Sequence, residues 1–172
     1  MEVRSMAPAE ADSLPVVHAE TWEKTYLGQV PDALALDRIA QARNRDWTSH
    51  SELRAQLGGG VLVLVEDGVV VGFCEFGPTE DSDEDPKRVG HIMRIYVLPA
   101  YQGRGGGRLL LETACSRLAA GGHESVTLWT PRADTNLAHN FYGGLGWSRE
   151  TATKDDEVRY RLFLFVTSPN YR

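Results

Sequence analysis

The chain has 172 residues, of which 42% are hydrophobic, and this length and composition fit one globular domain with a core of its own. Its net charge of -6 at pH 7 argues against nucleic acid as a partner, because nucleic-acid-binding domains usually carry a basic surface. We find no run of about 18 apolar residues and no signal-peptide pattern, so we expect a cytoplasmic protein without membrane partners.

Metal and disulfide chemistry are not indicated. The five histidines lack the spacing of a metal site, so we expect no metal cofactor. Cys74 and Cys115 are too few for a disulfide framework and are predicted to be small buried hydrophobic residues. The acidic stretch Glu80 to Asp85 lacks the glycine turn of a calcium loop and is expected to be a solvated connection between strands.

The first 60 residues predict one strand and two helices. Glu2 to Ser5 is a short strand. A helix follows, because residues with buried character recur every three or four positions, at Leu14, Val17, His18 and Trp22. Pro31 interrupts this pattern, and a second helix follows that we expect to end near Trp47.

The next segment predicts a sheet. Val61 to Glu66 and Val69 to Phe76 are rich in β-branched residues and are separated by Asp67-Gly68, a strong signal for a β-hairpin. They are therefore predicted to be neighbouring antiparallel strands. Gly90 to Leu98 is predicted to be the next strand.

The remaining chain predicts a parallel strand pair at the centre of the sheet. A helix over Leu109 to Ala120 leads to the strand Ser125 to Thr130, and a strand, helix and strand in this order imply a right-handed crossover. A helix from Thr135 to Tyr142, capped by Asp134, and two final strands complete the chain; these strands are predicted at Trp147 to Thr151 and Val158 to Phe165. The fold class is α/β (α+β), in a single domain over residues 1–172, with a mixed, mostly antiparallel sheet flanked by helices.

The segment between the strand at Gly90 to Leu98 and the following helix is predicted to bind phosphate. Four glycines occur between Gln102 and Arg108. Because glycine has no Cβ atom, several N–H groups can converge there on one anion at the positive end of the helix. Arg104 and Arg108 can add charge-assisted contacts. A P-loop is excluded because the loop has no lysine, and the spacing of the glycines does not fit a dinucleotide fingerprint.

Two motifs carry a resemblance to a known family. The loop reads Gln102-x-x-Gly105-x-Gly107, and about 35 residues later the chain carries Ala138, Phe141, Tyr142, Gly146 and Trp147. These motifs resemble the GNAT superfamily of N-acetyltransferases, whose coenzyme A loop reads Gln or Arg, two residues, Gly, one residue, and Gly or Ala. The resemblance implies direct transfer of an acetyl group from acetyl-CoA to a primary amine, without a covalent enzyme intermediate.

The same resemblance implies which residues bind the cofactor. The family's asparagine, seven residues before the tyrosine, corresponds to Thr135, so either Asn136 from one position later or Thr135 makes this contact. Backbone groups of one strand are expected to receive the pantetheine arm, and a bulge there to direct an N–H group at the thioester oxygen. The expected contacts are Ile95, Tyr96, Val97, Gln102, Gly103, Arg104, Gly105, Gly106, Gly107, Arg108 and Asn136.

Acetyl transfer requires a neutral amine and a proton for the departing thiolate. With a pKa near 10.4, on the order of one lysine-like amine in a thousand is neutral at pH 7. By resemblance, Tyr142 is the candidate acid that protonates the sulfur, and its alternative role is packing. His91 is the first candidate base, because strand alternation places it on one face with Met93, Ile95 and Val97. Glu75 is a second candidate, and a water chain is the third alternative.

The acceptor site is the least determined part. His18, Trp22 and Tyr26 form a stripe that, by resemblance, faces the acceptor amine, although packing on the sheet explains it equally well. The sequence does not identify the amine. The sequence does not determine the oligomeric state, although a homodimer is common among similar proteins. A non-catalytic acyl-CoA sensor is the alternative function, because the candidate base and the displaced asparagine depart from the family pattern.

Overall fold

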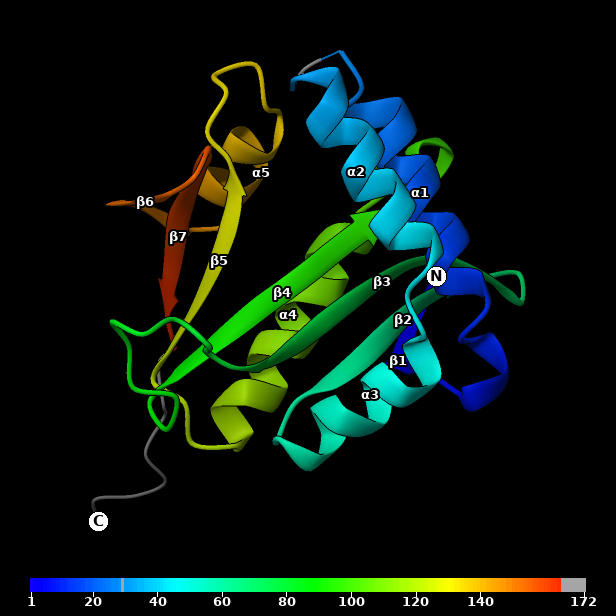
Figure 1. Ribbon diagram of the computed structural model, residues 1–172. Helices are drawn as coiled ribbons and strands as arrows, with labels where there is room; N and C mark the ends of the chain where they lie inside the picture. Colours follow the sequence, from blue (N-terminus) through cyan, green and yellow to red (C-terminus); the bar gives the residue numbers. More distant parts are fainter. Residues whose placement is uncertain (29, 165–172) are drawn as a thin grey trace.

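The computed structural model describes residues 1–28 and 30–164, which form a seven-stranded mixed sheet (Figure 1). The strand order is β1-β2-β3-β4-β5-β7-β6, and among these described strands only the central pair β4 and β5 is parallel. The predicted fold class is thereby confirmed. The strands are β1 (Glu2–Ser5), β2 (Gly60–Glu66), β3 (Val69–Pro78), β4 (Val89–Val97), β5 (Ser125–Pro131), β6 (Ser148–Lys154) and β7 (Glu157–Phe163).

Helices cover both faces of the sheet. One face carries α1 (Ser13–Thr25), α2 (Asp32–Arg43) and α3 (Trp47–Gln56), and the other carries α4 (Gly106–Ala120) and α5 (Ala138–Gly144) (Figure 1). Two single turns of 3-10 helix, η1 (Pro8–Glu10) and η2 (Pro99–Tyr101), precede α1 and the glycine-rich loop. Within the described residues, no helix is both long and apolar enough to cross a membrane.

The alternation of side chains along the strands produces two cores. In β2, Leu62 and Leu64 pack toward α4, whereas Val61 and Val63 pack toward α1 and α3 around Trp47. Each face of the sheet is thus buried under helices, which explains why β2 and β3 read as almost continuous apolar runs. Both cysteines are buried, as predicted.

The helical boundaries differ from the prediction in two places. The second helix ends at Arg43 rather than near Trp47, and α3 was not predicted. Asp46 begins this additional helix, because its side chain accepts hydrogen bonds from the N–H groups of Thr48 and Ser49. The sequence pattern does not reveal α3 because its apolar residues do not recur clearly at helical spacing. Without a predicted helix, Asp46 is not recognised as a capping residue.

The prediction for the last helix was also wrong at its start. The helix begins at Ala138 rather than Thr135, and Asp134 does not cap it. The oxygen of Asn136 accepts a hydrogen bond from the N–H group of Ala138 instead. The last strand ends at Phe163 within the described residues, and Phe165, where we predicted its end, lies outside them.

A bulge in β4 overturns the predicted alternation around His91. Glu75 of β3 pairs with Arg94, but the next residue of β3 pairs with Ile92, so Met93 is an extra residue in β4. The face therefore switches at Met93. His91 lies on the face toward α1 and α3, opposite to Ile95 and Val97, whose side chains pack into the core beneath α4.

Candidate active site

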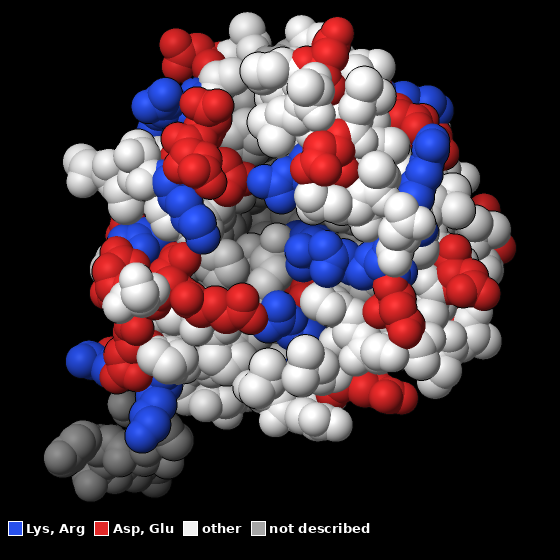
Figure 2. All heavy atoms as spheres, viewed as in Figure 1, with Lys and Arg blue, Asp and Glu red and all other residues white. Residues whose placement is uncertain are grey.

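The two parallel strands separate and open a cleft at the centre of the molecule. Pairing between β4 and β5 stops at Ile92 and Leu128, although both strands continue. A cavity of about 200 Å³ lies where they part, and it is bordered by both strands, by α1 and by Tyr142. Figure 2 shows a hollow near the middle of this face with positively charged side chains beside it. The site therefore lies at the carboxyl ends of the parallel strands, as expected for such sheets.

The glycine-rich loop lies at the N-terminus of α4. Gly103 and Gly105 adopt positive φ angles of 73° and 85°, and Gly105 occupies the N-cap position without any side-chain cap. Across the described part of the chain, no N–H group from residue 103 to residue 108 donates a hydrogen bond to the protein. These unpartnered N–H groups and the helix dipole are the features that favour the binding of an anion such as a phosphate.

The loop is joined closely to its surroundings. A Cβ atom on Gly107 would lie 3.2 Å from Cζ of Phe141, so the absence of a side chain allows α5 to approach the start of α4. Gln102 donates from Nε2 to the carbonyl oxygen of Val97 across 2.8 Å, which ties the loop to the end of β4. In this structure Arg104 donates to the carbonyl oxygen of Ala100, and Arg108 pairs with its helical neighbour Glu112.

Tyr142 lies at the junction of the cleft and the core beneath α4. Its side chain is 7% exposed and packs against Trp147 and Tyr160. Burial raises the pKa of the phenol well above its ordinary value, and the negative charge that nearby tyrosines would carry adds to this effect. Tyr142 is thus protonated at neutral pH and borders the cavity, which are two properties that an acid requires.

His91 is half-buried and borders the same cavity. Its Nδ1 atom lies 2.8 Å from the hydroxyl oxygen of Thr127 on the paired strand. Burial lowers the pKa of His91 to about 4, although the carboxylates of Asp81 and Glu80 oppose this change. The imidazole is therefore neutral at pH 7 and only a weak base.

Glu75 lies at the centre of a buried ion cluster rather than at an open surface. Its side chain is fully buried and accepts hydrogen bonds from Nε2 of His50 at 2.5 Å, Nε of Arg54 at 2.7 Å and a guanidinium nitrogen of Arg94. Burial alone would raise the pKa of Glu75, but the hydrogen bond from His50 and the charge of Arg94 outweigh it and lower the pKa to about 2. These contacts suit a positioning role, because so acidic a group is a poor base.

Asn136 and Thr135 occupy different environments. The Asn136 side chain is 6% exposed and donates to the hydroxyl oxygen of Thr130 at 3.0 Å and to the carbonyl oxygen of Pro131 at 2.8 Å. Its amide group thus holds the end of β5 against the start of α5. Thr135 is exposed, so its hydroxyl is the more accessible of the two groups.

The predicted acceptor stripe borders the cavity from α1 and its C-cap residue. His18, Trp22 and Tyr26 all line it. Trp22 donates from Nε1 to the hydroxyl oxygen of Tyr96 across 3.1 Å, and the imidazole of His18 stacks on the Tyr96 ring with centroids 4.4 Å apart. Packing and cavity lining, which the sequence offered as alternatives, therefore occur together.

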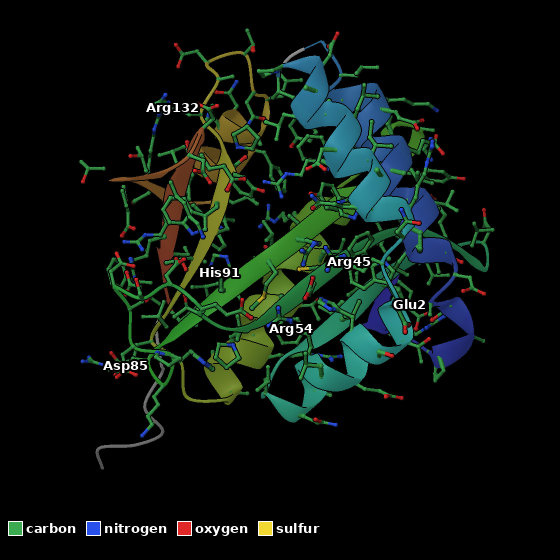
Figure 3. The ribbon with its side chains drawn as sticks, viewed as in Figure 1. Glu2, Arg45, Arg54, Asp85, His91 and Arg132 are labelled. Carbon is green, nitrogen blue, oxygen red and sulfur yellow. The ribbon has the colours of Figure 1, made fainter. Side chains whose placement is uncertain are left out.

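Four charged residues of the cavity were not predicted. Arg38 of α2, Arg45 of the segment before α3, and Arg94 of β4 line it, together with Glu157 at the start of β7. Figure 3 shows Arg45 beside β4, on the same face of the sheet as His91. None of the four lies in a recognisable motif, and only the tertiary arrangement brings them together.

Comparisons with known proteins agree with this site. Residues 19–147 match the Acetyltransferase (GNAT) family. An N-acetyltransferase of uncharacterised function from Archaeoglobus fulgidus is 28% identical over 143 residues, which cover 83% of this chain and 89% of that protein. The L-methionine sulfoximine/L-methionine sulfone acetyltransferase of Salmonella typhimurium is 43% identical over 76 residues, which cover 44% of this chain and 42% of that protein.

A solved structure shares the whole architecture. The PaiA N-acetyltransferase from Thermoplasma acidophilum, in complex with coenzyme A, matches 95% of this chain and 98% of its own with a TM-score of 0.79 and 21% sequence identity. Among the described residues, no group of three or more side chains is arranged to hold a metal ion. The family match spans most of the sequence, and the fold and the open central strand pair agree with it: the chain belongs to the acetyltransferase (GNAT) family.

Proposed function

We propose that this chain transfers the acetyl group of acetyl-CoA directly to the amine of a small molecule. The observation that carries the proposal is the row of unpartnered N–H groups at residues 103–108, placed beside the open edges of β4 and β5. This loop would hold the diphosphate of the cofactor. The pantetheine arm would then lie along Ile95 to Val97, whose edge toward β5 has no strand partner in the described structure.

The chain's own side chains supply the proton movements. The amine nitrogen forms a bond to the thioester carbonyl carbon, and the carbon–sulfur bond breaks. The departing sulfur takes the phenolic proton of Tyr142, which solvent restores. The amine gives up its protons to water, because His91 and Glu75 both have pKa values far below that of an amine. The products are the acetamide, free coenzyme A and one proton from each ammonium ion consumed.

Small amines are the acceptors to test first. The cavity between the separated strands is about 200 Å³, which is small for a binding pocket. The Salmonella relative acts, by its name, on derivatives of an amino acid. Both observations favour a small acceptor over a protein surface.

Two measurements test this function. Calorimetry should detect binding of acetyl-CoA to the purified protein, and a thiol-release assay with a panel of primary amines should detect turnover. Absence of any heat of binding would overturn the proposal. Binding without turnover for any amine would favour the acyl-CoA sensor instead.

A further inference from the structure

Three arginines converge on the acceptor side of the cavity. Arg38, Arg45 and Arg94 all line it. Their proximity is reflected in His18, whose pKa falls to about 3 because of burial and because the charges of Arg94, Arg45 and Arg38 disfavour its protonated form. A small cavity with this much positive charge attracts an anionic group.

Two of these arginines have guanidinium N–H groups that are available to a ligand. Arg94 pairs with the buried Glu75, which fixes its position. Arg45 lies over the ring of Trp47, and its Nε atom is buried without a hydrogen-bond partner. In the described part of the molecule, neither Arg45 nor Arg38 forms an ion pair. A buried guanidinium donor without an acceptor is costly, and an anionic ligand would relieve this cost.

A second unpartnered polar atom points to a ligand in the same place. The side chain of His18 is only 5% exposed, and its Nδ1 atom has no hydrogen-bond partner. Because His18 lines the cavity beside the three arginines, a bound molecule or its hydration water can supply the missing partner.

A carboxylate borders the cavity from the other half of the sheet. Glu157 is the first residue of β7. This strand lies on one side of β5, whereas β4 and α2, which carry Arg94 and Arg38, lie on the other side (Figure 1). It lines the cavity and a neighbouring outer hollow of about 680 Å³, which also includes Arg38. Burial raises the pKa of Glu157, and the charge of Arg38 opposes this effect. The cavity thus offers a carboxylate to an amine and guanidinium groups to an anion.

We propose that the acceptor is a small amine that also carries a carboxylate, such as a free α-amino acid, and that Arg45 and Arg38 bind the carboxylate while the amine faces Glu157. This inference rests on the proposed acetyltransferase function and specifies its substrate class. Arg94 and Glu75 form the fixed back of the carboxylate site. An amine without a carboxylate would leave Arg45 and Arg38 without an ion-pair partner among the described residues.

The test compares matched acceptors in the thiol-release assay. The 20 protein amino acids are first assayed with acetyl-CoA, and the best acceptor is then compared with its α-carboxamide and its decarboxylated amine. We expect kcat/KM to fall about 30-fold or more for both analogues, since each lacks one member of a charge-assisted contact.

Variants connect this preference to the residues. Arg45→Gln and, separately, Arg38→Gln should raise KM for the amino acid and so reduce its advantage in kcat/KM over the decarboxylated amine. Arg38 is exposed, so its substitution should not disturb the packing of the core. Arg43→Gln is the matched control, because Arg43 lies on the same helix and pairs with Glu23 away from the cavity.

The outcomes separate the two proposals. Equal or better turnover of amines without a carboxylate would overturn the carboxylate site and leave the acetyltransferase function standing. Retention of the amino-acid preference in both arginine variants would also overturn it. Failure of the protein to bind acetyl-CoA, or to acetylate any amine, would overturn the proposed function and this inference together.

Discussion

Arg54 donates a hydrogen bond from Nε to the fully buried carboxylate of Glu75 across 2.7 Å, and this contact joins α3 to strand β3. The same carboxylate holds Arg94, which lines the central cavity. One buried anion therefore connects a helix that the sequence pattern did not reveal to the side chains that line the cavity.

The first prediction concerns the stability of this cluster. Glu75→Gln should lower the free energy of unfolding by about 3–5 kcal/mol, because it removes the buried carboxylate that Arg54 and Arg94 share and leaves Arg94 without an ion pair in the described structure. Glu80→Gln is the control, since Glu80 also pairs with Arg54 but its side chain is 68% exposed, and it should cost at most about 1 kcal/mol. Urea denaturation at pH 7 measures both, and equal losses would contradict the assigned role of Glu75.

The second prediction concerns pH and His18. Burial and the arginine charges lower the pKa of His18 to about 3 in the folded protein, whereas the unfolded residue has a pKa near 6.5. The unfolded state therefore binds more protons between these values, and stability decreases as the pH falls below about 6.5. His18 alone should contribute a loss on the order of 1–2 kcal/mol between pH 7 and pH 5.

His91 contributes in the same direction, because its pKa is lowered to about 4. His18→Gln should thus reduce, but not abolish, the dependence of stability on pH in this range. Glu75 does not contribute there, because the stability from its lowered pKa is lost only as the pH falls from about 4.5 toward 2. Urea midpoints at pH 7 and pH 5 measure this dependence for both proteins. An identical change of midpoint between the two pH values in the variant and the natural chain would refute the prediction.

The third prediction concerns Tyr142. Tyr142→Phe should lower kcat by about 100-fold or more through loss of the acid, while acetyl-CoA affinity changes little. The raised pKa of the phenol also implies that the rate of the natural chain does not decline below pH 10 through ionisation of this group. Tyr101→Phe, in the turn before the loop, is the control. A Tyr142→Phe variant with undiminished kcat would remove this residue from the mechanism.

The fourth prediction concerns the loop backbone. Gly105 has a φ of 85°, which costs a residue with a side chain about 1–2 kcal/mol. In Gly105→Ala the free loop should relax from this conformation, and the Kd for acetyl-CoA should rise about 5- to 30-fold. Gly143→Ala is the matched control, because its added Cβ would meet no atom within 4 Å and its φ is not positive. Calorimetry measures both, and equal affinities would exclude a role for the Gly105 conformation.

The sequence predicted the parts of the molecule that local patterns determine. The hairpin at Asp67-Gly68, the glycine-rich run before α4 and the crossover to β5 each lie within a short segment, and the structure contains all three. The start of α3 was missed because it depends on one capping aspartate rather than on an apolar repeat.

The charged lining of the cavity could not be predicted in this way. Arg38 and Glu157 are far apart in the chain and meet only because α2 and β7 border the same opening. Likewise, the ion partners of Glu75 come from α3 and β4, so its burial and low pKa are properties of the tertiary structure. Neither residue type nor sequence spacing predicts such contacts between distant parts of the chain.

The extra residue Met93 determines what a bound molecule meets on β4. If β4 instead alternated regularly from His91 through Met93, Arg94 and Tyr96 would turn toward α4, and Ile95 would turn toward α1 in their place. The wall beside His18 would then offer a hydrocarbon side chain instead of a guanidinium and a phenol. The bulge at this single residue thus determines whether the wall of the opening is polar or apolar.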